Sequence, residues 1–477
     1  MKKKLIYLLC STLIFSTLSA CSNNKVSTGS VNTKEFTSID LSDEGKVLNI
    51  YCWHEEFKGY FETYYLGTMP ISDPDNSVAN FEGNTGDEVY YENAKGVPEG
   101  IEINWIVNPN DDGIYQDKLD TALLNSDSIK QDERVDMFLA EADYLYKYVD
   151  SPYTENVYNL GLSNFENTYE YTVNAATDSD GSLKGVSFQC CPSAIIYRRS
   201  IAKDIFGSDN PDIVQTYLDD WDKFDNTAKL AKEKGYYMVP SFSSTFRAFA
   251  NSKSIPWVDD NHNLQIDENI NKWIEQTDLY VNNGYCQTSG IWDEETTKQM
   301  FKSGKTFCYI GPAWFFQFSM NNARDDEDGT FGDWGVCKGP MPHFWGGTWL
   351  LAATGTDNPK LISDIMDTFV NDYDVCQHLI KDKNQFTNNK LANESFADDP
   401  LFGDAFLGGQ NATNIYCELA NNIKFDNQTI YDQLCNDGLQ NRLQEYWKGD
   451  VSKEDAMNNY YLYLNEKFPS IKTPINK

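Results

Sequence analysis

Short apolar runs alternate with amphipathic helical patterns along most of the chain. Three runs have the length and composition of buried strands: 47–52, 101–107 and 135–139. Three later runs, at 185–188, 306–310 and 350–352, fit the same description. Strands that alternate with helices are typical of an α/β protein, so we expect this fold class.

Two helices carry clear boundary signals. The first has Asp220 as N-cap, Trp221 and Phe224 among its apolar positions, and Gly235 just past its end. The second begins at Pro359, a residue favoured at the first helical position, and its apolar residues recur at helical spacing. From 68 to 96 no period is sustained and Asp, Asn, Gly and Glu dominate, which predicts an irregular surface insertion.

The first twenty residues predict export. Lys2 to Lys4 form a basic start, an apolar stretch at 5–18 is too short for a comfortable membrane span, and Leu18-Ser19-Ala20 precedes Cys21. This arrangement resembles the lipobox of bacterial lipoproteins, in which Cys21 becomes the lipidated first residue. We therefore expect a signal peptide at 1–20, a flexible tether at 21–45, and a body anchored by lipid on the extracytoplasmic face of the cell membrane.

The charge of the chain excludes some partners. It has 39 basic and 72 acidic side chains, a formal net charge of −33. Such an excess repels phosphate backbones and anionic headgroups, so we expect no nucleic acid and no electrostatic membrane contact. A neutral ligand is favoured, although an acidic surface alone does not name one.

Cysteine and histidine give no sign of a metal or cofactor. Nine cysteines remain after Cys10 and Cys21, without a CxxC or other metal-ligand spacing. The four histidines are far apart, with no His-Glu-x-x-His helix. The stretch 259–270 lacks the Gly and Glu of a calcium loop at its sixth and twelfth positions, so a hairpin between 257–258 and 264–266 is the better interpretation. We expect neither metal nor cofactor.

Aromatic and polar residues follow several predicted strands, and one group leads directly into the strand at 350–352. Open α/β sheets present ligand-binding residues at this edge, so these residues are candidates for one site. They are Trp53, His54 and Glu55; Glu141 and Asp143; Gln189; Trp314; and Trp345, Gly346, Gly347 and Trp349.

These residue types suit a sugar. A pyranose packs its C–H faces on flat aromatic rings, and its hydroxyls need planar partners such as carboxylates and amides. Tryptophans supply the first kind of contact, and Asp, Glu and Gln supply the second. Glycines beside Trp345 permit close approach of backbone to ligand.

Two other function classes remain open. A surface-anchored glycoside hydrolase would also use aromatic rings and two carboxylates, and Glu55, Glu141 and Asp143 are its candidates. A surface adhesion or scaffold lipoprotein predicts no stabilisation by any small molecule. Turnover of labelled oligosaccharides favours the enzyme, whereas binding without products favours a receptor.

The order of these signals resembles the carbohydrate-binding extracellular solute-binding proteins of bacterial ABC importers, the maltodextrin-binding-like group. The resemblance runs over nearly the whole chain after Cys21. Its most specific parts are Gly304-Lys305-Thr306-Phe307-Cys308-Tyr309-Ile310-Gly311-Pro312-Ala313-Trp314 and Trp345-Gly346-Gly347-Thr348-Trp349-Leu350. The loop Gly408-Gly409-Gln410-Asn411 also looks like a family loop that reaches the ligand.

The resemblance implies a two-lobed periplasmic-binding-protein-like fold, with hinge-linked lobes and a ligand cleft between them. Lobe 1 would hold 46–190 and 345–405, and lobe 2 would hold 191–344 and 406–470. It also implies a monomer that is not an enzyme and delivers a mono- or oligosaccharide to a membrane permease.

By position in the family pattern, Asp143 matches a ligand-binding acid and Trp314 a stacking ring, and Gln410 is expected at the ligand. The chain departs from the pattern in two places. Cys190-Cys191 stands on the first crossing between lobes, and Ala140 stands near the place of a stacking Trp, which argues against simply assigning maltose.

Overall fold

The structure is a computed structural model that describes residues 36, 39–71 and 89–475. The predicted signal peptide, Cys21 and most of the predicted tether lie outside the described residues, as does 72–88 of the predicted insertion. A helix long and apolar enough to cross a membrane is not found in the described part of the chain.

The larger sheet has five strands in the order β2-β1-β3-β8-β4. Their bounds are β1 Val47–Cys52, β2 Glu102–Val107, β3 Met137–Glu141, β4 Gly185–Ser187 and β8 Thr348–Ala352. β1 pairs in parallel with β2 and β3, whereas β8 runs antiparallel to β3 and β4. The residues after β1 and β3 and those before β8 therefore lie at one edge of the sheet.

The smaller sheet has three strands in the order β6-β5-β7, with β5 antiparallel to both neighbours. The bounds are β5 Ala194–Arg198, β6 Cys308–Gly311 and β7 Trp334–Cys337. Every residue of these three strands is buried, because helices or loops cover both faces.

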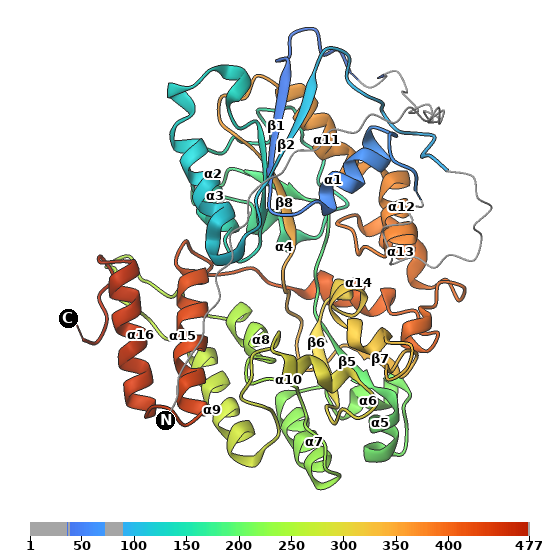
Figure 1. Ribbon diagram of the computed structural model, residues 1–477, viewed down its shortest axis with the longest axis vertical. Helices are drawn as coiled ribbons and strands as arrows, with labels where there is room; N and C mark the ends of the chain where they lie inside the picture. Colours follow the sequence, from blue (N-terminus) through green and yellow to red (C-terminus); the bar gives the residue numbers. More distant parts are fainter. Residues whose placement is uncertain (1–35, 37–38, 72–88, 476–477) are drawn as a thin grey trace, which may run out of the picture. The chain divides into compact units, whose positions relative to one another are not determined.

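Helices cover the larger sheet in Figure 1 and share one hydrophobic core with it. They are α1 Glu56–Tyr60, α2 Ile114–Leu124, α3 Leu145–Val149, α4 Glu170–Ala175, α11 Pro359–Asn371 and α12 Tyr373–Lys383, and a π-helical turn, η1 Phe61–Tyr65, follows α1. The three-residue 3₁₀ turns η2 Asp111–Gly113, η3 Ser126–Ser128 and η4 Gln131–Glu133 lie between β2 and β3.

The smaller sheet has a core on each face. The helices on one face are α5 Arg199–Phe206, α6 Pro211–Thr216, α7 Trp221–Glu233, α8 Phe246–Asn251, α9 Glu268–Asn283, α15 Asp432–Trp447 and α16 Lys453–Lys467. The other face packs on α14 Thr413–Asn422, η6 Phe315–Ser319, η7 Asn321–Arg324 and η8 Ala405–Leu407. Three short elements complete the fold: α10 Glu294–Thr297, η5 Lys298–Met300 and α13 Lys390–Ala397.

The helix that begins at Trp221 confirms its predicted start. The Asp220 carboxylate accepts a hydrogen bond from the Lys223 backbone N–H at 2.8 Å, which satisfies one of the donors that a helix start leaves free. Phe224 and two alanines face the core, and Gly235 follows the end of the helix with φ of +85°. The helix predicted at Pro359 is also confirmed, as α11.

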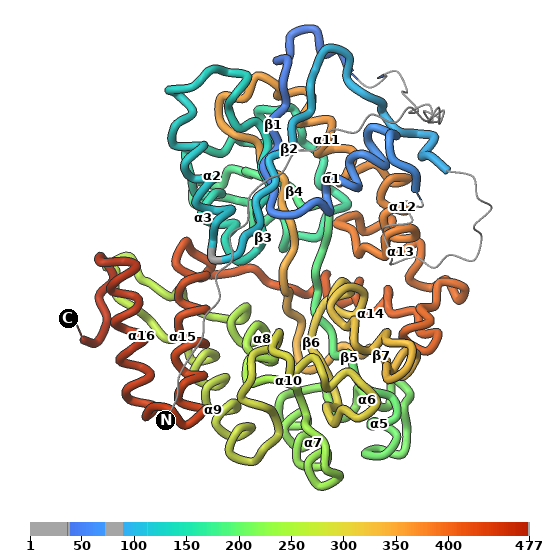
Figure 2. The backbone as a smooth tube through the Cα atoms, in the orientation of Figure 1, coloured from blue at the N-terminus to red at the C-terminus, as the bar shows by residue number. Residues whose placement is uncertain are grey.

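The chain passes between the two sheets in the segments 188–193, 338–347 and 398–404, as the tube in Figure 2 shows. The first two segments are joined by an antiparallel bridge between Pro192 and Phe344. The thiols of Cys190 and Cys191 are buried in the first segment, which raises their pKa. The lobe boundaries drawn from the sequence stay a prediction.

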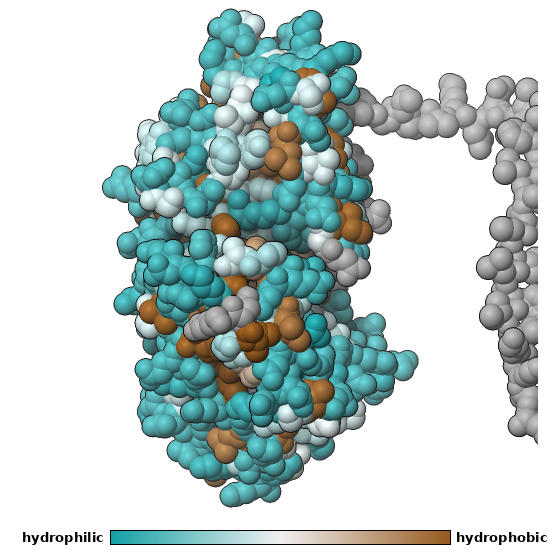
Figure 3. Space-filling model, turned by 90° about the vertical axis from the view of Figure 1, so that its left-hand side faces the viewer, coloured by the Kyte–Doolittle hydropathy of each residue, from teal (hydrophilic) through white to brown (hydrophobic). Residues whose placement is uncertain are grey.

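The cysteines and the predicted hairpin at 257–266 have structural roles. All nine cysteines of the described residues are buried and free. An antiparallel bridge joins Val258 to Leu264, which confirms the hairpin, and the Asp259 carboxylate accepts hydrogen bonds from backbone N–H groups within its turn. Figure 3 shows a face that is mostly hydrophilic, with separate apolar residues in its upper half and a larger apolar group in its lower half.

Candidate functional site

A cavity of about 690 Å³ lies where loops from the two sheets meet, and we call it the tryptophan cavity. Its lining comprises Trp53, His54, Glu55, Glu56, Lys58, Gly59, Tyr60, Glu62, Met69, Glu141, Gln189, Trp314, Phe318, Trp345, Gly346, Gly347, Thr348 and Lys383. Of the residues predicted for the site, the structure brings together nine: Trp53, His54, Glu55, Glu141, Gln189, Trp314, Trp345, Gly346 and Gly347. Asp143, Trp349 and Gln410 do not line this cavity.

Trp53 follows the last residue of β1, at the loop edge of the larger sheet. Its ring meets those of Tyr115 and Tyr144 edge-on, with centroids 5.7 and 6.1 Å apart. The His54 ring also meets it edge-on, with centroids 5.1 Å apart. The half-buried Trp53 ring is thus fixed in orientation, and little conformational freedom would be lost on binding a ligand.

Glu141, the last residue of β3, has an environment that opposes ionisation. Burial is the larger cause and the neighbouring Asp143 charge the second, and together they raise the pKa of Glu141 to about 8. The Arg247 guanidinium acts in the opposite direction but does not outweigh them. A protonated Glu141 is neutral and can donate as well as accept a hydrogen bond.

Asp143 is paired with a residue that the sequence did not single out. Both of its carboxylate oxygens accept hydrogen bonds from Arg247 of α8, at 2.6 and 2.7 Å. The same guanidinium lies 5.3 Å from the centre of the Trp345 ring. Asp143 thus anchors Arg247, and it does not line the cavity. Its predicted role as a hydroxyl acceptor stays a prediction.

Trp314 and Trp345 form the opposite wall. Trp314 lies between β6 and η6, and its indole N–H donates to the Trp345 carbonyl at 3.3 Å. The centroids of the two rings are 5.2 Å apart, and the rings meet edge-to-face at an angle of 68°. The ring of Trp292, which is 57 % exposed and does not line the cavity, lies 5.6 Å from that of Trp345. Trp292 was not among the residues predicted for the site, because it lies in a loop that follows no predicted strand.

The two glycines after Trp345 have backbone angles that other residues rarely adopt. Gly346 has φ of +75° and Gly347 has φ of +119°. A Cβ on Gly346 would lie 3.5 Å from both Glu141 and Trp314, and one on Gly347 would lie 3.1 Å from the Trp349 ring. The glycines therefore allow the backbone to pass close to the groups that line the cavity.

Gln189 joins the cavity to the first crossing segment. Its amide nitrogen donates to the Thr348 hydroxyl at 3.0 Å, and its amide oxygen accepts from the Cys191 thiol at 3.5 Å. The side chain is buried and fixed at the junction of β4, β8 and the crossing segment. It lines the cavity as predicted, but both ends of its amide already have partners.

Two predicted site residues are structural instead. Trp349 is 0 % exposed and donates its indole N–H to the Thr172 carbonyl inside the core. Successive residues of a strand point to opposite faces, so Thr348 faces the cavity and Trp349 faces away. Gln410 accepts from the Val336 N–H and donates to the Val336 carbonyl, which completes the free edge of β7.

The tryptophan cavity has the composition of a ligand-capture site. In the described part of the chain, no three His, Cys, Asp or Glu side chains come together in a way that could hold a metal ion. Rings, amides and a neutralised acid surround a space within the range of about 300–1,000 Å³ typical of small-molecule sites. Fold and cavity together define the class of solute-binding proteins with two α/β lobes.

The chain belongs to the family of bacterial extracellular solute-binding proteins, whose family model matches residues 90–403. This confirms the family resemblance found in the sequence, and the two-lobed α/β fold expected from it. No curated protein matches the chain.

Solved structures share this fold. An extracellular solute-binding protein of family 1 superposes with a TM-score of 0.70 at 19 % identity, covering 88 % of this chain and 99 % of its own. The galacto-N-biose/lacto-N-biose I-binding protein of the ABC transporter from Bifidobacterium longum, in complex with lacto-N-biose, gives 0.60 at 14 % identity, with 89 % and 98 % covered. An ABC-transporter-associated binding protein from B. animalis subsp. lactis Bl-04, in complex with β-1,6-galactobiose, gives 0.59 at 15 % identity, with 90 % and 99 % covered.

Proposed function

We propose that this protein captures a neutral mono- or oligosaccharide in the tryptophan cavity and delivers it to the permease of an ABC importer. The observation that carries the proposal is the joining of Trp53 from one sheet with Trp314 and Trp345 from the other side of one cavity. Structural relatives that hold lacto-N-biose and β-1,6-galactobiose support the same ligand class.

The wall chemistry matches a sugar ring. Flat indole faces pack against the C–H face of a pyranose, and each such contact buries a large apolar area at low entropic cost. Hydroxyls at the ring edge would bond to polar groups of the lining, and Glu141, Glu55 and His54 are candidates. The site residues are therefore proposed for those two roles, stacking and hydroxyl binding.

A neutral ligand is favoured because the cavity's charges are partly balanced. Glu55 pairs with Lys58 at 3.2 Å, and Glu141 is protonated near neutral pH because its pKa is raised. The lining also holds Glu56 and Glu62 against Lys383, an acidic excess that disfavours an anionic ligand. Near the cavity, Asp143 and Arg247 form an ion pair, so their charges also offset each other.

We further propose that the protein works as a lipid-anchored monomer. The support is the sequence before the described residues, where Leu18-Ser19-Ala20 precedes Cys21. A lipid on Cys21 and the tether that follows would keep the binding lobes close to the permease. In this arrangement lobe 1 (46–190 and 345–405) and lobe 2 (191–344 and 406–470) close around the sugar.

A thermal-shift screen tests the ligand class. The panel contains maltotetraose, cellotetraose, xylotetraose, mannotetraose, lacto-N-biose and β-1,6-galactobiose. A ligand that binds only the folded protein raises its melting temperature, so we expect at least one sugar to raise it in a concentration-dependent way. The proposal would be contradicted if none of the six sugars raised the melting temperature of the protein.

The same samples separate capture from hydrolysis. Chromatography of the sugars after prolonged incubation should recover them intact and in stoichiometric complex with the protein. Release of shorter sugars would instead favour a glycoside hydrolase that uses Glu55, Glu141 or Asp143.

A further inference from the structure

The ion pair of Asp143 and Arg247 joins two parts of the molecule. We call the larger sheet with the helices of its core the larger-sheet part, and the smaller sheet with the helices of its two cores the smaller-sheet part. Asp143 follows β3 of the first part, and Arg247 belongs to α8 of the second. Among the ion pairs of the residues that the structure describes, this is the only one between the two parts.

Asp143 is fixed to the edge of the larger sheet. Its backbone N–H donates to the Glu141 carboxylate at 2.8 Å. The N–H of Ala142 donates to the Gly347 carbonyl at 3.1 Å, in the loop before β8. Asp143 is therefore held next to Glu141 and Gly347, which both line the tryptophan cavity.

Arg247 is fixed to the smaller-sheet part through α8. Phe246 and Ala248, its neighbours in the helix, are buried, and the Phe246 ring meets that of Trp273 edge-on with centroids 4.7 Å apart. The Arg247 guanidinium also lies over the Trp345 ring, on the wall opposite Trp53. The side chains of Arg247 and Asp143 are 30 % and 34 % exposed, so water reaches the pair.

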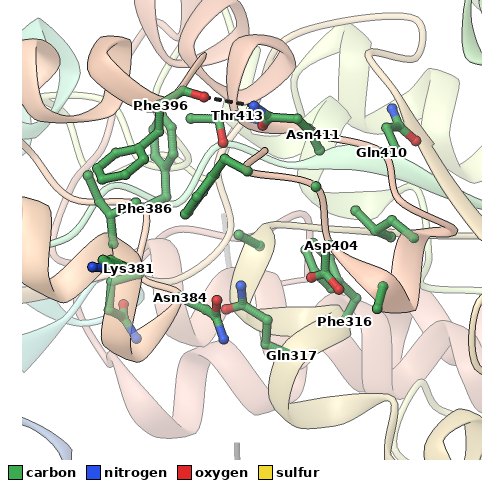
Figure 4. Close-up of a pocket in the computed structure, with 18 of the residues that line it drawn as sticks. Phe316, Gln317, Lys381, Asn384, Phe386, Phe396, Asp404, Gln410, Asn411 and Thr413 are labelled. Atoms are coloured by element: carbon green, nitrogen blue, oxygen red, sulfur yellow. Dashed lines mark hydrogen bonds between the residues drawn. The ribbon is translucent and has the colours of Figure 1, made fainter. Parts of the chain in front are cut away.

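Figure 4 shows a larger cavity, of about 1380 Å³, that lies between the same two parts. Lys381 of α12 lines it from the larger-sheet part, and Gln317 of η6 lines it from the smaller-sheet part. The bond drawn there runs from Asn411 to the Phe396 carbonyl at 2.7 Å, and it joins residues that flank the crossing segment 398–404 in the chain. The Asp143–Arg247 pair, in contrast, joins residues that are distant from every crossing segment in the chain.

Any movement of the two parts away from each other would stretch both hydrogen bonds of this pair. A two-pronged bond between arginine and carboxylate is stronger and more exacting in geometry than a single one. Because the pair is partly exposed, we expect it to favour the closed arrangement by a modest factor, about three- to tenfold. A ligand that binds between the parts gains apparent affinity when the closed arrangement is already populated.

We propose that Arg247 is a positioning residue for ligand capture. Paired with Asp143, it holds the two parts together around the tryptophan cavity and raises the affinity for the sugar without touching it. Neither residue lines that cavity. The effect on affinity rests on the proposed function, whereas the fastening of the two parts rests on the geometry of the pair alone.

Calorimetric titration with the panel sugar that gives the largest thermal shift tests the effect on affinity. Arg247→Gln and Asp143→Asn should each weaken binding about three- to tenfold. The double variant should bind no more weakly than the weaker of the two single variants, because both changes remove the same pair. Arg247→Lys, which keeps the charge but not the two-pronged bond, should lose less than Arg247→Gln.

Losses that add up in the double variant would show that one of the two residues acts on the sugar independently of the other, and this would overturn the proposal. Unchanged affinity in either Arg247→Gln or Asp143→Asn would overturn it as well. Lys147→Gln is the matched control. Lys147 pairs with Asp120 at 2.6 Å and is similarly exposed, but both residues belong to the larger-sheet part, so its affinity should equal that of the wild type.

Small-angle X-ray scattering tests the fastening without any ligand. The radius of gyration of unliganded Arg247→Gln should exceed that of the wild type and of Lys147→Gln, and a saturating sugar should bring all three to the same value. Equal radii of the three unliganded proteins would overturn the proposal. If none of the six sugars binds, the proposed function fails and the effect on affinity fails with it, while the scattering comparison still decides whether the pair fastens the two parts.

Discussion

At the scale of single residues, Glu141 is a carboxyl group of the tryptophan cavity whose pKa is raised by folding into the range where proteins are usually studied. Its pKa rises from a usual 4.5 to about 8, because burial and the Asp143 charge disfavour the carboxylate. The folded protein therefore binds this proton more tightly than the unfolded chain does. The resulting stability is fully present below about pH 4.5 and is lost as the pH rises through about 8.

Glu141→Gln should remove this pH dependence, because a glutamine keeps the shape and cannot ionise. In thermal melts from pH 5 to pH 9, the melting temperature of the variant should rise relative to that of the wild type as the pH increases. This relative rise should be steepest below about pH 8. Burial also raises the pKa of Asp437, which is present in both proteins, so their difference reports on Glu141 together with the charges coupled to it. Two melting curves that stay parallel across this range would show that Glu141 is ionised throughout.

Residues also show where sequence patterns stop being informative. Trp314 and Trp345 could be predicted as partners, because each stands beside an apolar run that becomes a strand. Arg247 could not, since it binds Asp143 from 104 residues further along the chain and belongs to no motif. The prediction that Trp349 lies in the binding site was wrong. The aromatic residues around Trp345 continue into β8, where successive side chains point to opposite faces and the Trp349 side chain lies in the core.

At the scale of elements, the loop before β8 depends on glycine. Gly347→Ala would force a side chain into φ of +119° and place its Cβ 3.1 Å from the Trp349 ring. Gly355 also has positive φ, at +81°, but has no atom within 4 Å of a built Cβ, so Gly355→Ala is a matched control. Backbone strain alone costs about 1–2 kcal/mol, and we expect Gly347→Ala to lose more than its control in urea unfolding.

Binding distinguishes these two variants further. Gly347→Ala should weaken the sugar complex because it displaces the wall of the tryptophan cavity, whereas Gly355→Ala should bind sugar like the wild type. Equal losses of stability in the two variants, with equal affinities, would show that close packing at Gly347 is unimportant.

The prediction of strands and helices from the sequence succeeded where an apolar run was long or where a helix had a clear capping residue. The run at 47–52 became β1 with the same bounds, and Asp220 marked the start of α7. β5 and β7 are four or five residues long, buried on both faces and without alternation, and they were not assigned as strands, although the equally short and buried β6 was. Neither pattern nor propensity indicates that Gln410 completes the β7 edge.

At the scale of the whole molecule, the two sheets and their cores meet at cavities built from distant parts of the chain. The tryptophan cavity takes Trp53 from the loop after β1, Trp314 from the turn after β6 and Trp345 from the loop before β8. Arg247 of α8 crosses from the smaller sheet's side to Asp143, beside the larger sheet. This convergence is the central claim, because stacking on rings from both sides requires it.

The most direct test is calorimetric titration of Trp314→Ala with the sugar that gives the largest thermal shift. Trp221→Ala is the control, since it removes the same side chain from a position that lines neither cavity. We predict that Trp314→Ala weakens binding by roughly tenfold or more, about 1.4 kcal/mol, while Trp221→Ala leaves the affinity unchanged. Equal affinity of Trp314→Ala and wild type would contradict the account.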